Sequence, residues 1–269
     1  MQMDIVDLRQ FYATPLGAMA RRSVQLALTS LWKPLTSERL VGLGYATPWL
    51  DAFRADAERT LALMPARQGA VHWPFGEDCA TALVFDEDLP LADASIDRML
   101  LVHALEHFEN VDEALSEIWR VLAPGGKLII VVPNRRGVWA RMEHTPYGSG
   151  RPWSGGQLSK LLRSHMFTPT SWSDALHFPP SSKKLASRFA PTMERFGRRF
   201  VPAFAGVLVV EATKQVYQGL PVRQRQSRRV FVPVLAPQGA SSTGSNTNRT
   251  GRDTPSAKNA GVSKRKLVI

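Results

Sequence analysis

The chain has 269 residues, with 34 Lys and Arg against 23 Asp and Glu, one cysteine and 44% hydrophobic residues. This is enough apolar sequence for a domain of ordinary size, and it excludes a chain that is disordered throughout. No apolar stretch approaches the ~20 residues of a membrane-spanning helix, and the opening Met-Gln-Met-Asp lacks the layout of a signal peptide. A lone Cys79 can form neither an internal disulfide nor a cysteine-rich zinc site, so we expect a cytoplasmic protein without a metal centre.

The net charge of +11 is concentrated at the end of the chain. Residues 220–269 hold ten basic residues and one acid, whereas the preceding 219 residues hold 24 basic and 22 acidic ones. Residues 238–263 contain one large apolar side chain, Val262, so we predict that this tail is largely disordered. A basic tail of this kind suits an anionic partner, either a nucleic acid or a membrane surface, and says little about the near-neutral body.

Helical and strand patterns alternate along the body. Helical spacing of apolar residues predicts helices over residues 4–32, with a break near Pro15, within 46–60 and over 110–122. The predicted strands are residues 39–44, 61–64, 82–85, 96–102, 127–132 and 207–212. The strand at 127–132 is apolar without alternation, which is typical of a strand buried on both faces. This order predicts a parallel sheet with helices on both sides.

Three segments in order carry a family resemblance. They are Leu89-Pro-Leu-Ala-Asp-Ala-Ser-Ile-Asp97, His103-Ala-Leu-Glu-His107 and Ala114-Leu-Ser-Glu-Ile-Trp-Arg-Val-Leu-Ala-Pro-Gly-Gly126. Together they resemble the class I S-adenosylmethionine-dependent methyltransferases, in the small-molecule, methyltransferase type 11-like branch. The resemblance implies a Rossmann-like, seven-stranded, mostly parallel sheet flanked by helices, with an antiparallel last strand and an N-terminal helical lid. It also implies S-adenosylmethionine as cofactor and a small-molecule methyl acceptor.

The chain then divides into a lid at residues 1–38, a methyltransferase domain at 39–219 and a basic tail at 220–269. The oligomeric state and the acceptor are not readable from the sequence. In this family the lid helix often faces the acceptor, which points to Phe11 and Tyr12. The basic loop between Asn134 and Trp153 is either an acceptor-binding region or a solvated surface loop.

The resemblance assigns cofactor-binding roles to residues that follow the strands. Gly42, Gly44 and Tyr45 correspond to the turn beside the methionine part of the cofactor, and Met64 to the residue beside the ribose. Phe85 and Asp86 correspond to the loop flanking adenine. Val102 and His103 correspond to the turn beneath the sulfonium.

Three positions depart from the family pattern. Leu40 stands where the family usually has an acid, Ala46 where it has a third glycine, and Met64 where it has an acid that binds both ribose hydroxyls. These departures leave open a second function, that of a catalytically silent methyltransferase fold that binds a partner through its basic tail. A nucleic-acid methyltransferase is disfavoured because no Asn/Asp-Pro-Pro-Tyr motif follows the strand at 96–102.

The candidate catalytic residues are those able to accept a proton from the acceptor: His103, Glu106, His144 and Tyr147. The segment His103–His107 also has the H-x-x-E-H spacing of a class of zinc proteases. That alternative requires both histidines on one face of a helix, whereas this segment directly follows a strand and precedes a helix cap at Asn110.

Overall fold

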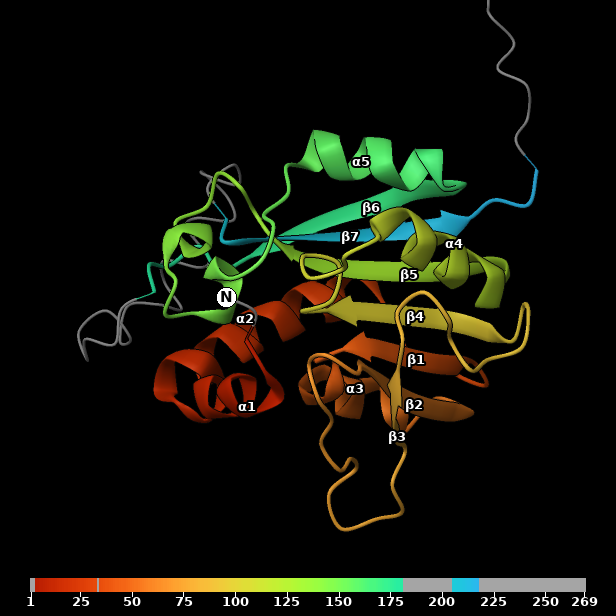
Figure 1. Cartoon of the computed structure of the whole chain (residues 1–269), viewed down its shortest axis with the longest axis horizontal. Helices are drawn as coiled ribbons and strands as arrows, with labels where there is room; N and C mark the ends of the chain where they lie inside the picture. Colours follow the sequence, from red (N-terminus) through yellow and green to blue (C-terminus); the bar gives the residue numbers. More distant parts are fainter. Residues whose placement is uncertain (1–2, 33, 181–204, 218–269) are drawn as a thin grey trace, which may run out of the picture. The chain divides into compact units, whose positions relative to one another are not determined.

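The computed structural model describes residues 3–32, 34–180 and 205–217, whose strands form one mixed sheet (Figure 1). The strands are β1 Arg39–Gly44, β2 Arg59–Pro65, β3 Thr81–Val84, β4 Ile96–Val102, β5 Leu122–Pro133, β6 Phe167–Ala175 and β7 Val207–Lys214. Their order is β3-β2-β1-β4-β5-β7-β6. The first five strands in that order are parallel, and β7 runs antiparallel to both β5 and β6. The predicted mostly parallel sheet with an antiparallel last strand is confirmed.

Helices cover both faces of this sheet (Figure 1). The helices are α1 Ile5–Ala13, α2 Pro15–Leu31, α3 Thr47–Arg54, α4 Val111–Val121 and α5 Gly155–Ser164, with short 3-10 turns η1 Trp139–Arg141 and η2 Pro146–Gly148. One buried apolar cluster contains side chains of α2 and α3, such as Leu28 and Trp49. A second contains side chains of α4 and α5, such as Ile118 and Leu158. The sheet lies between these two layers.

The predicted helix break near Pro15 is confirmed. The side chain of Asp4 accepts hydrogen bonds from the first backbone amides of α1, and α1 ends at Ala13. Thr14 then caps α2 by accepting from the amide of Gly17, and Pro15 occupies the first turn, where its missing N–H leaves no bond unmade. The sequence therefore encodes two helices with a sharp joint between them.

Two elements went unpredicted, and several strand boundaries differ from the prediction, most of all that of β5. Helix α5 begins with a capping box between Ser154 and Gln157, and β6 alternates between exposed and half-buried residues. Strand β5 begins directly after α4, at Leu122, rather than at residue 127. Residues 66–80 and 86–95, which join β2 to β3 and β3 to β4, contain no helix. Parallel strands are usually joined through a helix, so these two connections lack the helix that is typical of such crossovers.

The end of α4 holds the loop that precedes β4. Arg120 donates hydrogen bonds to the carbonyls of Leu89 and Leu91, at 3.1 and 3.0 Å, and pairs with Asp93 and Glu117. Glu117 in turn accepts from the amide of Leu89 at 2.8 Å. Two of the three resembling segments are thus joined by these bonds, and their part in the molecule is structural.

The carboxyl ends of β1 and β4 form the point where the strand order reverses. From β1 the chain crosses to β2 and β3 on one side, and from β4 to β5 on the other. Open parallel sheets bind ligands in the crevice beyond such a switch point. No helix among residues 3–32, 34–180 and 205–217 is long and apolar enough to cross a bilayer. The predicted tail at 220–269 lies outside the described residues, which end at position 217.

Candidate functional site

The glycine turn after β1 is packed tightly against its neighbours. Gly44 has φ +84°, and a Cβ there would lie 2.4 Å from the carbonyl oxygen of Val102. A Cβ at Gly42 would lie 2.7 Å from the side chain of Leu50 and 2.8 Å from that of Ala46. Glycine is required at position 44 because the end of β1 has a left-handed backbone and passes directly against the backbone of β4, and at position 42 any side chain would displace those of Ala46 and Leu50.

The end of β2 is apolar. Met64 is fully buried and packs with Leu8 of α1 and with Tyr45, which follows β1. Leu40 and Ala46, the other two departures from the family pattern, are also buried in the core. The apolar surroundings explain why no acid stands at Met64, since an isolated carboxylate there would lose its hydration without gaining a partner.

A small cavity lies beside these residues, between the carboxyl ends of β2 and β4. Its volume is about 10 Å³, and it is lined by Pro65, Arg67, Gln68, Asp86, His103, Ala104, His107 and Phe108. Two buried acceptor atoms on residues of this lining, Oε1 of Gln68 and Oδ2 of Asp86, receive no hydrogen bond from any described residue. Buried acceptors without a donor are rare in folded proteins, and they indicate a place where a ligand can donate.

Asp86 is the acidic group of this cavity. Its side chain is 2% exposed, and burial raises the pKa of its carboxyl above the usual value. The nearest cation, Arg67, lies 3.7 Å from Asp86 and also pairs with Glu87 and Glu109. The guanidinium is therefore shared among three carboxylates and only partly offsets the cost of burying Asp86.

A chain of polar side chains lies over the end of β4. The Nδ1 atom of His103 is 3.3 Å from Oε1 of Glu106, and Nε2 is 2.7 Å from the hydroxyl of Tyr12. The hydroxyl of Tyr12 is in turn 2.8 Å from that of Tyr147. Three of the four predicted catalytic candidates are thus brought together. The fourth, His144, is exposed, and no contact joins it to this chain in the described part of the structure.

The protonation of the two phenols sets the direction of these hydrogen bonds. Burial raises the pKa of Tyr12 well above its usual value, and burial likewise raises the pKa of Tyr147. Both hydroxyls keep their protons at neutral pH. With Nδ1–H of His103 facing the carboxylate of Glu106, Nε2 is the free acceptor, and Tyr12 donates to it while Tyr147 donates to Tyr12.

Aromatic rings surround the hydroxyl pair. Tyr45 stacks on Tyr12 at a centroid distance of 5.7 Å, and Trp49 meets Tyr12 edge-on at 5.3 Å. Trp139 meets Tyr147 edge-on at 5.6 Å. His103 itself has φ +51°, a left-handed conformation that is uncommon for a non-glycine residue. The imidazole is held by its partners on both nitrogens in this strained turn.

The other predicted site residues divide between core and surface. Val102 is fully buried in β4, whereas Phe85 is 68% exposed. The arginines of the predicted acceptor loop, at positions 135, 136, 141 and 151, are exposed, and Arg151 stacks over the ring of Trp153 at 4.8 Å. That loop presents cations to solvent rather than to the cavity.

The segment His103–His107 is a turn and not a helix. The turn removes the shared helix face on which the zinc-protease alternative depends. Gln68 was not predicted, and Tyr12 was expected only to face the acceptor. The signal for Gln68 is faint: it is the nearest polar, uncharged residue to the apolar end of β2.

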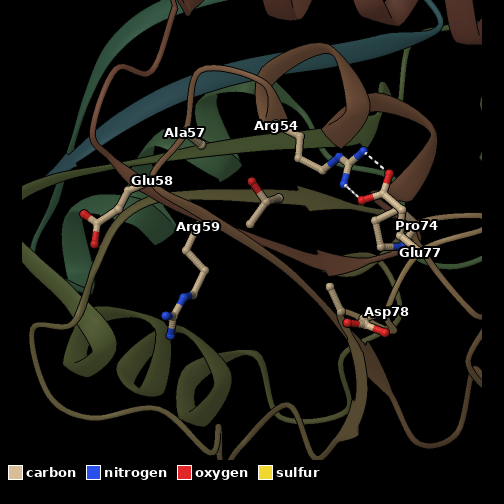
Figure 2. A pocket seen from close by; sticks show the side chains of 9 residues that line it. Arg54, Ala57, Glu58, Arg59, Pro74, Glu77 and Asp78 are labelled. Atoms are coloured by element: carbon tan, nitrogen blue, oxygen red, sulfur yellow. Dashed lines mark hydrogen bonds and ion pairs between the residues drawn. The ribbon is translucent and has the colours of Figure 1, made fainter.

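A larger cavity, of about 550 Å³, lies at the opposite end of β2 (Figure 2). It is lined by Arg59 and Thr60 at the amino end of that strand and by Arg54, which pairs with Glu77 across the rim. Figure 2 shows both acidic and basic side chains around it, with no aromatic platform among the labelled residues. Ligands of open parallel sheets bind at the carboxyl ends of the strands, so we place the candidate site at the smaller cavity.

Comparison with known proteins finds methyltransferases. A family model described as a methyltransferase domain matches residues 31–130. A demethylmenaquinone methyltransferase of Thermus thermophilus is 29% identical over 134 residues, covering 49% of this chain and 54% of that protein. A ubiquinone/menaquinone biosynthesis C-methyltransferase of Rubrivivax gelatinosus is 31% identical over 132 residues, covering 45% and 47%. The chain spans about half the length of these curated relatives.

Solved structures share the fold over a longer range. A putative methyltransferase solved with a methyltransferase activator from Haloferax volcanii has a TM-score of 0.57 at 19% identity, covering 79% of this chain and 98% of that one. A possible histamine N-methyltransferase of Thermotoga maritima has a TM-score of 0.55 at 19% identity, covering 78% and 96%. At this identity the likeness concerns the fold alone.

Proposed function

We propose that this protein, whose residues 31–130 match the family model of a methyltransferase domain, transfers a methyl group from S-adenosylmethionine to a small molecule. The observation that carries the proposal is the meeting, at the switch point of the sheet, of two unpartnered buried acceptors and a hydrogen-bonded imidazole. The acceptors serve binding, and the imidazole serves proton removal.

The polar groups of the small cavity suit the adenosine part of the cofactor. The ribose hydroxyls and the adenine amino group are donors, and Oε1 of Gln68 and Oδ2 of Asp86 are acceptors without a donor among the described residues. The present volume of about 10 Å³ is far below the roughly 300 Å³ or more of ordinary ligand pockets. We infer that α1, whose Leu8 packs on Met64 and Tyr45, moves when the cofactor binds.

The chemistry of the donor limits what the protein must do. When bound, S-adenosylmethionine supplies an activated methyl group on its sulfonium, so the protein has to align the acceptor with it and exclude water. His103 and the aromatic rings around it belong to this task. An acceptor hydroxyl that takes the place of the Tyr12 hydroxyl would present its proton to Nε2 of His103, and Glu106 would hold the imidazole in the required orientation.

This arrangement favours an aromatic acceptor with an ionisable hydroxyl. The imidazole of His103 contacts the rings of Tyr12 and Tyr147, and behind these pack the rings of Tyr45, Trp49 and Trp139. Such aromatic surroundings suit a flat, apolar ring. The curated relatives are named for demethylmenaquinone and for ubiquinone and menaquinone biosynthesis, so reduced quinones and simple phenols are the first acceptors to test.

The test is a transfer assay with full-length protein, S-adenosylmethionine and matched acceptors. Formation of S-adenosylhomocysteine and of methylated product is followed by mass spectrometry, with a hydroquinone, a phenol and an aliphatic amine of similar size. We expect turnover with the hydroxylated aromatic compounds and none with the amine. Turnover confined to the amine would refute the proposed acceptor class.

A further inference from the structure

Gln68 bridges the carboxyl ends of β2 and β4, two strands that β1 separates in the sheet. It stands in the turn after β2. Its backbone N–H donates to the backbone carbonyl of Pro65 at 2.8 Å, and its backbone carbonyl accepts from the backbone N–H of Ile5 at 2.9 Å. The residue is 2% exposed. Its side chain reaches the end of β4, where Nε2 donates to the carbonyl oxygen of His103 at 3.0 Å.

This bond fixes which way the side-chain amide faces. A carbonyl oxygen can only accept, so the NH₂ group of Gln68 must face His103 and Oε1 must face away from it. Gln68 lines the small cavity together with Asp86, and no described residue donates to its Oε1. A buried acceptor held in one orientation without a donor is costly in the free protein, and a bound donor would remove that cost.

We propose that Oε1 of Gln68 accepts a hydrogen bond from a ribose hydroxyl of the cofactor. It would take over part of the role of the family's ribose-binding acid, whose position is occupied by Met64 in this chain. The inference rests on the proposed function, because it assigns a binding residue to that same site. Asp86 lies on the same cavity and stays available for the adenine amino group. Arg67 cannot serve the ribose in this way, since its guanidinium has no acceptor and is already shared by Asp86, Glu87 and Glu109.

A neutral amide differs from a carboxylate in what it offers. It presents one acceptor atom, whereas the family's acid binds both hydroxyls with charge-assisted bonds. We therefore expect one hydroxyl to carry the ribose preference. Removing that hydroxyl from the cofactor should weaken cofactor binding by about 5- to 10-fold, the effect of losing one neutral hydrogen bond.

The experiment measures binding of S-adenosylhomocysteine and of its 2′,3′-dideoxy analogue by isothermal titration calorimetry on the full-length chain. We expect the wild type to bind the dideoxy analogue about 5- to 10-fold more weakly. Gln68→Met should weaken S-adenosylhomocysteine by a similar factor and bind both compounds equally. A purely structural role of Gln68 would instead weaken both compounds alike and preserve their ratio, which would overturn the inference.

Two further variants keep the test decisive. Gln68→Glu loses the bond to His103 but keeps an acceptor, so it should retain the preference for the ribose hydroxyls even if Gln68→Met folds poorly. Gln25→Met is the matched control, since Gln25 on α2 also has a buried amide atom without a partner among the described residues but does not line the cavity. It should leave both affinities unchanged.

Wild type that binds S-adenosylhomocysteine with no preference for its hydroxyls overturns this inference alone. Wild type that binds neither compound overturns the proposed function as well.

Discussion

The hydroxyl of Tyr12 lies 2.7 Å from Nε2 of His103, and this contact joins α1 to the carboxyl end of β4. It brings the first helix of the chain onto the edge of the sheet where the cofactor and the acceptor are proposed to meet. The same hydroxyl contacts Tyr147, which lies in the η2 turn. Three distant segments thus share one short hydrogen-bonded chain, and its imidazole is the group on which we expect transfer to depend.

Replacing His103 by Asn should remove the proton acceptor while sparing the fold. Asn tolerates the positive φ of this position, and the backbone carbonyl that binds Gln68 is retained. We expect methyl transfer to fall by about 10²- to 10⁴-fold, while the affinity for S-adenosylhomocysteine becomes no weaker than that of the wild type, because losing the bond to Tyr12 only makes the cavity easier to open. Single-turnover rates and calorimetry on the same preparation measure the two quantities.

His144→Asn is the control for that experiment, because His144 is an exposed histidine apart from the chain of hydrogen bonds. It should transfer methyl groups at the wild-type rate. Loss of transfer in His144→Asn with full activity in His103→Asn would reverse our assignment of the proton acceptor.

Removing the Tyr12 hydroxyl should make the cofactor site easier to open. Tyr12→Phe keeps the stacked ring but deletes the bonds to His103 and Tyr147, each worth roughly 1 kcal/mol. Because the cavity of about 10 Å³ must enlarge, weakening the closed state should tighten S-adenosylhomocysteine binding by about 5-fold or more. Hydrogen exchange of the backbone amides of α1 should also become faster. The control is Tyr217→Phe, at an 87% exposed tyrosine, which should change neither the affinity for S-adenosylhomocysteine nor the exchange rate in α1. If Tyr12→Phe instead binds S-adenosylhomocysteine more weakly, the hydroxyl of Tyr12 contacts the ligand and this account is wrong.

Asp86 should cost stability at neutral pH in the free protein. Burial raises its pKa in the folded state, so the folded protein binds a proton more readily than the unfolded chain, and stability falls as pH rises from the unfolded pKa through the folded one. Asp86→Asn should therefore unfold at a higher temperature than wild type at pH 7. The difference should shrink as the pH falls through the raised pKa of Asp86 toward the ordinary carboxyl range, because the wild-type side chain then becomes neutral as well. Thermal unfolding at several pH values measures it, and a difference that grows on acidification would contradict this account.

Arg120 should matter for stability rather than for binding. Arg120→Leu loses bonds to two carbonyls and to Glu117 and Asp93, and we expect the free energy of unfolding to fall by roughly 1–2 kcal/mol, because the guanidinium is about one-third exposed. Arg163→Leu, on the exposed side of α5, is the control and should change it by less than about 0.5 kcal/mol. Urea unfolding measures both, and equal effects in the two variants would contradict the structural role of α4.

Much of the sheet was predictable because its strands are continuous apolar runs and α4 has clear end signals. Strand β6 escaped prediction because its exposed and half-buried residues, such as Thr168 and Ser171, carry little apolar periodicity. Residues of the candidate site that directly follow strands, such as Asp86 and His103, could be named from the sequence, and both line the small cavity. Gln68 could not be named in this way, because its role depends on a bond across the sheet to the carbonyl of His103, which no local pattern encodes. Leu40, Ala46 and Met64, the three residues that depart from the family pattern, are all buried in apolar surroundings.

The most direct measurement is calorimetric titration of the full-length protein with S-adenosylmethionine and S-adenosylhomocysteine. The account predicts saturable binding of both compounds at one site, weakened by Gln68→Met and unaffected by Gln25→Met. Folded protein that binds neither compound at millimolar concentration would contradict it.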